Sequence, residues 1–245
     1  MHATNESCRW LHERLESLGS AVRYPFSLDN LPLNGINFFY EEGEVWGHGG
    51  SKPRIVRIGT HRDVNFRSRM GEHFLTSESS MQFDATKSRP HDRSIFRKNL
   101  GRALLTLNGD PYLEMWNRDF TRDEIKVQYR RVRNVEKEKD LESKVTGILR
   151  KRFSFRFIIV SNQTERMGKS GLESRLIGTA ARCDECRPSN SWLGLSSPVE
   201  KIRSGHLWLV QHLNSPPISD EDRGKITSAI AITKDWLESF IQGQS

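Results

Sequence analysis

Apolar residues recur along the chain with two different periods, which predict helices and strands in turn. Leu11, Leu15 and Leu18 are spaced for one face of a helix, and Gly19 stands where such a helix would end. Alternating or continuous apolar residues predict strands at 36–40, 54–59 and 153–160. The first two strands are so close in sequence that we expect them to pair as an antiparallel hairpin.

Helical spacing returns in several other segments. The ranges expected to be helical are 67–74, 94–107, 135–150 and 171–179. A last helix begins after Ser219, with Asp222 three residues on as a near-capping box. Its apolar stripe consists of Ile226, Ile230, Leu237 and Ile241. This order predicts one α/β (α+β) domain over 1–245, with a small, central, mainly antiparallel three-stranded sheet flanked by helices.

Composition excludes several classes of protein. Hydrophobic residues make up 35% of the 245, enough for a core, but no apolar run approaches the ~18 residues of a membrane span. The first residues lack the basic and then apolar segments of a secretory signal. Three cysteines are too few for a disulfide framework, and an odd number fits a reducing compartment. We therefore expect a cytoplasmic protein.

The positive charge is concentrated in one fifth of the chain. The formal net charge is +7, and the window from Lys52 to Arg102 holds twelve Lys and Arg against five acids, so the other residues together are neutral. Such a concentration is typical of a surface that binds a polyanion, most simply the phosphates of nucleic acid. A solvated basic face without a partner is the alternative.

Three segments hold residue types used in phosphate and metal chemistry. The first is Gly35-Ile36-Asn37-Phe38-Phe39, followed in the next strand by Arg57-Ile58-Gly59-Thr60-His61. The second contains Arg69 and His73, four residues apart and so on one helical face. The third, 172–177, places Glu173 as a lone carboxylate on an otherwise apolar helix face.

The order and spacing of these segments resemble the GIY-YIG nuclease family. Further segments at 53–61, 94–97 and 191–194 resemble its bacterial, restriction-endonuclease-like branch. The resemblance spans 32–213, with a helical insert at 109–152 and peripheral helices at 1–20 and 219–242. It implies a GIY-YIG-like fold and a metal-dependent DNA endonuclease of the restriction or defence type.

The resemblance also implies a role for each matching residue. Arg69 matches the arginine that contacts the scissile phosphate, and His73 matches a position that helps to place or relay a proton. Glu173 matches the ligand of the divalent cation, Mg²⁺ or Mn²⁺. The alternatives are an ordinary surface arginine, a structural histidine and a solvated glutamate. Arg57 replaces the tyrosine of the second motif and would contact phosphate or water, and branch members often lack tyrosine there.

The first motif departs from the family at Asn37, where the family has a tyrosine that activates or orients the attacking water. A carboxamide can hydrogen-bond water but cannot take its proton near neutral pH. His61 is a candidate substitute base, with a plain loop histidine as the alternative. Proton transfer is therefore altered, or this copy is impaired, or the residue was changed to trap a complex. The competing functions are an inactive nucleic-acid-binding module and an RNA-directed nuclease of the same fold.

The predicted partner is double-stranded DNA. The residues expected to contact it are Lys52, Arg54, Arg62, Arg67, Arg93, Arg97, Lys98 and Asn190. Asn190 matches a late asparagine of the family. A homodimer is reasonable because symmetric cleavage of a duplex needs two sites, and a partner methyltransferase or defence-system protein would suit a restriction role.

Cys183-Asp184-Glu185-Cys186 forms a C-x-x-C motif. A structural zinc needs four ligands, and we find no second C-x-x-C, so only His206 and His212 are considered to complete a site. A redox motif usually follows a strand and opens a helix, whereas this one follows a predicted helix and precedes Pro188. We therefore interpret these cysteines as plain thiols, with zinc and redox roles as the alternatives.

Overall fold

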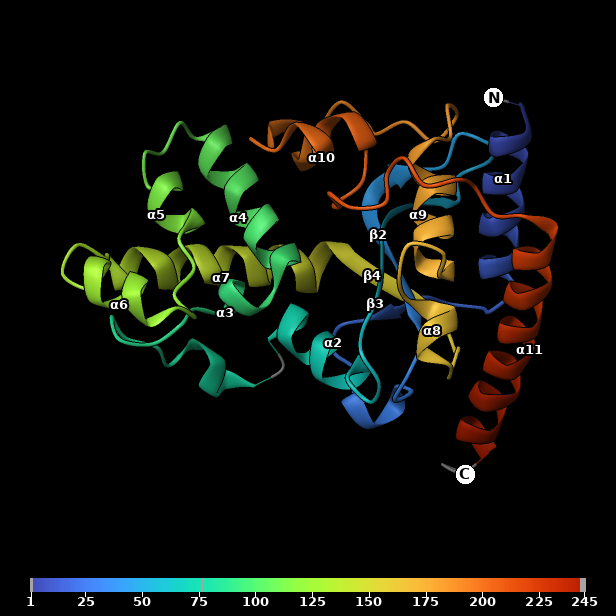
Figure 1. The fold of residues 1–245 in the computed structure, drawn as a ribbon, viewed down its shortest axis with the longest axis horizontal. Coiled ribbons are helices and arrows are strands. Elements are labelled where there is room, and N and C mark those ends of the chain that lie inside the picture. The colour runs from blue at the N-terminus through green and yellow to red at the C-terminus, as the bar shows by residue number, and fades with distance from the viewer. Residues whose placement is uncertain (1, 76, 243–245) are drawn as a thin grey trace.

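The protein is built around one antiparallel sheet, seen in a computed structural model that describes residues 2–75 and 77–242 (Figure 1). Its strands are β1 (Val22–Arg23), β2 (Ile36–Val45), β3 (Pro53–Thr60) and β4 (Phe153–Ile158), in the order β1-β4-β2-β3. The predicted fold class is confirmed. The sheet has four strands rather than the predicted three. The sequence did not predict β1 because its two residues are too few to show alternation.

The predicted hairpin is formed by β2 and β3. Asn37 pairs with Gly59 and Phe39 with Arg57, and the register shifts before Tyr40, which pairs with Ile55. Paired residues point to the same face of a sheet and successive residues to opposite faces. Asn37 and Arg57 therefore lie on one face, whereas Tyr40 packs with the apolar residues of the other face.

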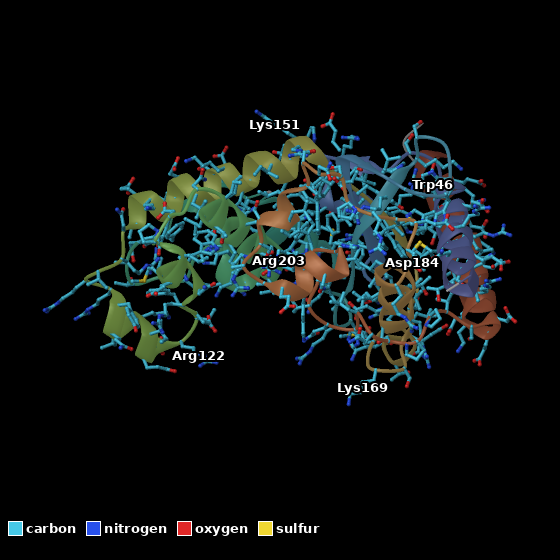
Figure 2. All side chains as sticks on the ribbon, turned by 90° about the horizontal axis from the view of Figure 1, so that it is seen from above. Trp46, Arg122, Lys151, Lys169, Asp184 and Arg203 are labelled. Atoms are coloured by element: carbon cyan, nitrogen blue, oxygen red, sulfur yellow. The ribbon has the colours of Figure 1, made fainter. Side chains whose placement is uncertain are left out.

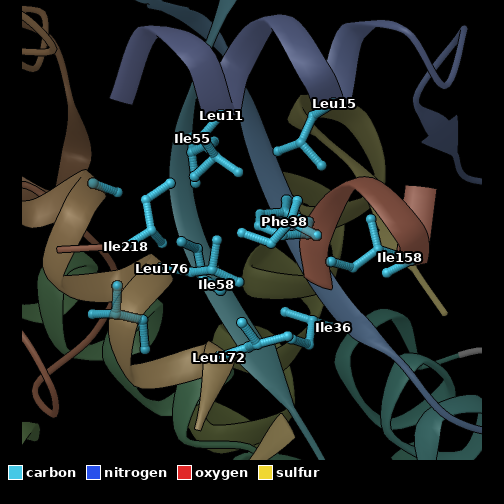
Figure 3. Close-up of a cluster of buried hydrophobic side chains, with 14 of the residues drawn as sticks. Leu11, Leu15, Ile36, Phe38, Ile55, Ile58, Ile158, Leu172, Leu176 and Ile218 are labelled. Carbon is cyan, nitrogen blue, oxygen red and sulfur yellow. The ribbon is translucent and has the colours of Figure 1, made fainter. Parts of the chain in front are cut away.

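Helices cover both faces of the sheet. One face packs against α1 (His2–Glu16), α9 (Leu172–Ala181) and α11 (Asp220–Gln242). Figure 3 shows the apolar cluster on this side, in which Phe38 and Ile58 of the hairpin meet Leu11, Leu15 and Leu176. The other face packs against α2 (Phe66–Phe74), α4 (Ile95–Leu107) and α7 (Val135–Arg152), mainly through phenylalanines.

The remaining helices are short. They are α3 (Pro90–Arg93), α5 (Leu113–Asn117), α6 (Asp123–Tyr129), α8 (Gln163–Arg166) and α10 (Glu200–Gly205), with 3₁₀ turns at Leu28–Asn30, Glu78–Met81 and Leu193–Ser196. Figure 1 shows α4 to α7 extending to one side of the sheet, while α1 and α11 lie side by side at the opposite end. None of the described helices is long and apolar enough to span a membrane.

The expected cap of the last helix is present. The backbone N–H and hydroxyl of Ser219 donate to Asp222 Oδ2 at 2.9 Å, and the N–H of Asp222 donates back to Ser219 Oγ at 3.2 Å. Ile226 and Ile230 are buried as predicted. The side chain of Ile241 lies outside the described residues. Reciprocal capping fixes where α11 begins.

Five of the twelve cations in the basic window are buried, and three of these five are in ion pairs. Arg97 Nη2 donates to Glu142 Oε2 at 2.5 Å between α4 and α7, and Arg89 and Arg133 share Glu138. The buried members of the window are Arg54, Arg57, Arg89, Arg97 and Lys98. Charge counting cannot distinguish a paired core cation from a surface one.

Three of the predicted DNA contacts, Arg54, Arg97 and Lys98, are therefore buried and hydrogen-bonded within the protein. Arg54 is 1% exposed and donates to Glu44 Oε2 at 2.6 Å. Arg97 is fully buried in its bonds to Glu142, and Lys98 donates to the Arg118 carbonyl at 3.1 Å. Buried cations stay in place because they are paired, so these side chains are not available to a backbone phosphate.

Candidate active site

The two sequence motifs meet in the β2–β3 hairpin, where their glycines allow close approach. A Cβ on Gly59 would lie 3.2 Å from Asn37 Oδ1. A Cβ on Gly35 would lie 2.6 Å from the Ile158 carbonyl oxygen of β4, closer than packing tolerates. The Thr60 hydroxyl donates to the Gly35 carbonyl at 2.8 Å. The glycines thus hold the motif strands together at the end of the sheet where Asn37 lies.

Glu173 reaches this end of the sheet from the first turn of α9. Its Oε1 accepts the backbone N–H of Thr60, on edge strand β3, at 3.0 Å. Its Oε2 has no hydrogen bond among the described residues. Burial raises the pKa of Glu173, while the Thr60 bond and the positive charge of Arg57 act in the opposite direction. The carboxylate is therefore oriented, partly desolvated and adjacent to a cation.

Arg57 and Arg69 supply the positive charge. Burial lowers the pKa of Arg57 to about 10, so it remains protonated at neutral pH. Its Nη1 donates to the Trp208 carbonyl at 2.7 Å, and its guanidinium lies 4.8 Å from the centre of the Phe96 ring. Arg69, half-buried on α2, donates through Nη1 to the Arg93 carbonyl at 2.8 Å and to Glu72 Oε2 at 2.5 Å.

Two neutral histidines complete the group. Burial, and then the charges of Arg69 and Arg57, lower the pKa of His61 to about 3. Burial lowers the pKa of His73 well below 6.5, and the same arginines contribute. The two ring centres are 6.1 Å apart. His73 Nδ1 lies 2.8 Å from Ser94 Oγ, which links α2 to the start of α4. Each imidazole therefore keeps a lone pair near neutral pH.

Several polar atoms in this group are buried without a partner among the described residues. They are both amide atoms of Asn37, Nε of Arg57, Nε2 of His61 and Nε2 of His73. Buried polar groups in native proteins are nearly always hydrogen-bonded, so a cluster of unpaired ones indicates a site for polar ligands. The carboxylate of Glu173 and the amide oxygen of Asn37 are hard oxygen donors, which suit a divalent cation such as Mg²⁺.

The predicted contacts Arg62, Arg67 and Arg93 lie at or near α2. Arg62 is exposed just after β3. Arg67 donates to the carbonyls of Leu31 and Asp29, at 2.7 Å and 3.1 Å. The Arg93 side chain is 69% exposed and its Nε lies 3.6 Å from a Glu72 oxygen. These three cations remain accessible to a polyanion beside the pocket.

Lys52 and Asn190 do not join this pocket. Lys52 lies at the other end of the hairpin, with Nζ 5.1 Å from the centre of the Trp46 ring. Asn190 is exposed and follows Ser189, whose hydroxyl donates to Glu44 Oε1 at 2.5 Å. Glu44 is seven residues from Asn37 along β2, which corresponds to roughly 23 Å at the rise of a strand.

The sequence did not point to Thr60 and Ser94 as parts of the site. Thr60 acts through its backbone N–H, which carries no signal in a side-chain pattern. Ser94 caps α4, accepting the Arg97 N–H at 3.3 Å, while it contacts His73. The conspicuous Ser94-Ile95-Phe96-Arg97 segment was the available signal for Ser94.

Comparison with known proteins agrees with this geometry. A family model described as the GIY-YIG domain matches residues 5–227, which is most of the chain. No curated protein and no solved structure matches the chain. Members of the matched family are phosphodiester-hydrolysing endonucleases that generally use divalent metal ions. The chain therefore belongs to the GIY-YIG family of nucleases.

Proposed function

We propose that the protein is a metal-dependent endonuclease that hydrolyses double-stranded DNA in restriction or defence, in the cytoplasm. The observation that carries the proposal is the meeting of Glu173 and Arg57 with two neutral histidines and unpaired polar atoms at one end of the sheet. A carboxylate, a cation and a neutral base are the groups that phosphodiester hydrolysis requires.

Glu173 is the residue that would hold the cation. The Thr60 N–H fixes one of its oxygens and leaves the other for Mg²⁺ or Mn²⁺. Mg²⁺ commonly takes one or two protein carboxylates and keeps water and substrate phosphate as its other ligands. When bound, the cation supplies positive charge that stabilises the phosphate and the leaving oxygen. The partly desolvated position of Glu173 strengthens that interaction.

Arg57 and Arg69 would bind the scissile phosphate. A guanidinium presents parallel N–H donors to phosphate oxygens and keeps its charge through the reaction. Arg57 has a buried, unpaired Nε that a phosphate oxygen would satisfy. Arg69 is held by Glu72, so phosphate would compete with that carboxylate for it. Because the Arg69 side chain on α2 is partly exposed, we expect the phosphate to approach from the solvent side of that helix.

His61 would accept the proton of the attacking water, while the Asn37 amide orients that water. His61 is neutral because Arg57, Arg69 and burial disfavour its charged form. A phosphate bound between the two arginines offsets their charge and so raises the pKa of His61 toward the range useful for a general base. His73, tied to Ser94, would hold its neighbour in position.

A basic groove beside α9 would bind the DNA backbone. It has a volume of about 850 Å³, and Lys169, Arg182 and Lys201 line it without any carboxylate among the lining residues. Figure 2 shows Lys169 projecting from this side of the molecule. A groove of one charge sign attracts a polyanion. Symmetric cleavage would use a homodimer, and a restriction role would pair the enzyme with a methyltransferase.

The test is nicking of supercoiled plasmid DNA with Mg²⁺ or Mn²⁺, with structured RNA as a second substrate. We expect the parent protein to cleave DNA, Glu173→Ala to be inactive, and the matched control Glu200→Ala, at an exposed position on α10, to cleave normally. Cleavage of RNA alone would overturn the DNA assignment. Failure of every variant to bind or cleave nucleic acid would overturn the whole proposal.

One observation favours a second candidate, an inactive nucleic-acid-binding module. Asn37 is 1% exposed and its amide is unpaired, and it has no basic group to replace the family tyrosine. Asn37→Tyr distinguishes the two candidates. Cleavage that appears only in this variant would identify a disabled copy, whereas cleavage by the parent that His61→Ala abolishes supports the altered proton transfer proposed above.

A further inference from the structure

A second polar cluster lies away from the candidate active site, at the far end of the hairpin. Cys8 of α1, His48 of the β2–β3 loop, and Cys183 and Cys186 after α9 place their donor atoms within 4.8 Å of one another. Figure 2 shows sulfur atoms gathered between Trp46 and Asp184. The three cysteines are buried and not disulfide-bonded. Three thiols and an imidazole form a donor set that zinc prefers.

The measured separations match a tetrahedral centre. With Zn–S about 2.3 Å and Zn–N about 2.0–2.1 Å, tetrahedral angles place two sulfurs about 3.8 Å apart and a sulfur and nitrogen about 3.6 Å apart. Cys8 Sγ lies 3.9 Å from Cys186 Sγ, and Cys183 Sγ lies 3.5 Å from His48 Nε2. The four donors are therefore spaced for a single shared ion.

The neighbouring groups orient these side chains through hydrogen bonds, as groups around zinc ligands do. Nδ1 of His48 lies 2.7 Å from Glu185 Oε2, so Nδ1 carries the proton and Nε2 presents its lone pair toward Cys183. His12 Nε2 accepts the Ile55 N–H at 3.2 Å, so its proton is on Nδ1, which donates to the Cys8 carbonyl oxygen at 2.9 Å. A carboxylate hydrogen-bonded to the second ring nitrogen of the ligand histidine favours a bound cation.

The backbone is shaped to bring the two loops together. A Cβ on Gly47 would lie 1.7 Å from the Glu185 carbonyl oxygen, so only glycine fits beside His48. This contact joins the hairpin loop to the C-x-x-C segment. From the sequence, only His206 and His212 were candidates for further ligands. Cys8 and His48 are far from the C-x-x-C motif in the chain, and tertiary packing brings them to it.

We propose that Cys8, His48, Cys183 and Cys186 bind one structural Zn²⁺. Four protein ligands leave no open position, as in structural rather than catalytic zinc sites. The ion ties together α1, the hairpin loop and the segment after α9. It therefore anchors the end of α9 opposite to Glu173. This proposal does not depend on the nuclease function.

The test is the metal content of the full chain purified after expression with added zinc. We expect one Zn²⁺ per chain, released when a mercurial reagent titrates the three thiols. Co²⁺ in place of Zn²⁺ should give the thiolate charge-transfer and d–d bands of a tetrahedral site. His48→Ala should lose bound metal in competition with a chelator, and His48→Cys should keep it. Glu185→Gln should weaken zinc binding by about 10- to 100-fold.

His206→Asn is the matched control, because it removes a histidine outside the donor set and should leave zinc content unchanged. Whether zinc binds is decided by the metal content of the parent protein, so the test remains valid even if a variant fails to fold. Three freely reactive thiols with no bound zinc, or a disulfide between Cys183 and Cys186, would overturn the proposal. So would zinc that His206→Asn loses and His48→Ala keeps.

Discussion

The backbone N–H of Thr60 donates to Oε1 of Glu173 at 3.0 Å and so joins edge strand β3 to the first turn of α9. This bond orients the carboxylate, and because its donor is a neutral N–H the carboxylate keeps its negative charge. Arg57 lies three residues before Thr60 on the same strand. Its positive charge therefore acts on the carboxylate of Glu173, although the two residues are far apart in the sequence. The hairpin thus organises both the acidic and the basic parts of the pocket.

Replacing Glu173 by Gln should abolish metal-dependent cleavage. Glutamine can still accept the Thr60 N–H through Oε1 but has no charge to hold a divalent cation. We expect cleavage to fall by about 100-fold or more, the usual size of losing one electrostatic group of an active site. Melting temperature and DNA affinity should change little. Glu200→Gln is the control, and undiminished cleavage in Glu173→Gln would contradict the assigned role.

Arg93 and Arg97 should separate DNA binding from stability. Arg93→Ala removes an exposed cation, so we expect a weaker DNA complex and a salt dependence reduced by about one unit of slope. Its free energy of unfolding should change by less than about 0.5 kcal/mol. Binding titrations over a range of salt concentrations measure the first effect, and chemical denaturation measures the second.

Arg97→Ala should show the opposite behaviour. It leaves Glu142 buried without its partner, which costs about 3–5 kcal/mol of folding free energy. DNA affinity per folded molecule should stay the same. An Arg97→Ala protein of normal stability that has lost DNA affinity would restore the original reading of Arg97 as a phosphate contact.

Acid should destabilise the protein below neutral pH through its buried histidines. Burial lowers the pKa of His12 to about 4 and that of His73 well below 6.5. The unfolded chain binds protons near pH 6.5 whereas the folded chain does not, so this stability is present above pH 6.5 and is lost as pH falls below it. At pH 5 the shift of His12 costs about 2 kcal/mol of stability, and the shift of His73 acts in the same direction.

His73→Phe isolates one of these contributions. Phenylalanine fills the space between Phe39 and Phe96, which pack edge-on against the imidazole, and it cannot be protonated. Denaturation at pH 7 and pH 5 should show a smaller loss of stability on acidification in the variant than in the parent. Equal losses in the two proteins would mean that His73 is not held neutral.

The motif glycine Gly35 should be intolerant of even a methyl group. Gly35→Ala places a Cβ against the backbone of Ile158, which cannot move away as a flexible side chain would. We expect a loss of about 1–3 kcal/mol in folding free energy. Gly147→Ala is the control in helix α7, where a Cβ meets nothing within 4 Å, and it should raise stability by about 0.5–1 kcal/mol.

The sequence predicted those features that depend on local periodicity. The strands at 36–40 and 54–59 and the capped helix after Ser219 are present because alternation, helical spacing and capping act between near neighbours. The two-residue β1 and the short helices α5 and α6 lack enough residues to establish a period. The predicted roles of the site residues remain to be tested by the variants above.

What the sequence could not show depends on contacts between distant segments. Arg97 looked like a surface cation because its partner, Glu142, lies 45 residues away. His48 was not recognised as a candidate ligand because it lies 135 residues from Cys183. In both cases the role of the side chain depends on a partner that is distant in the sequence and lies close only in the folded chain.

The outer edge of β3 has a further consequence, for association between molecules. An exposed strand edge offers unpaired N–H and carbonyl groups to the sheet of another copy, a route to aggregation. Here Glu173 accepts the Thr60 N–H and the Trp208 N–H donates to the Val56 carbonyl at 2.8 Å. These contacts occupy outward-pointing backbone groups of β3 and so disfavour the addition of a strand from another copy at this edge.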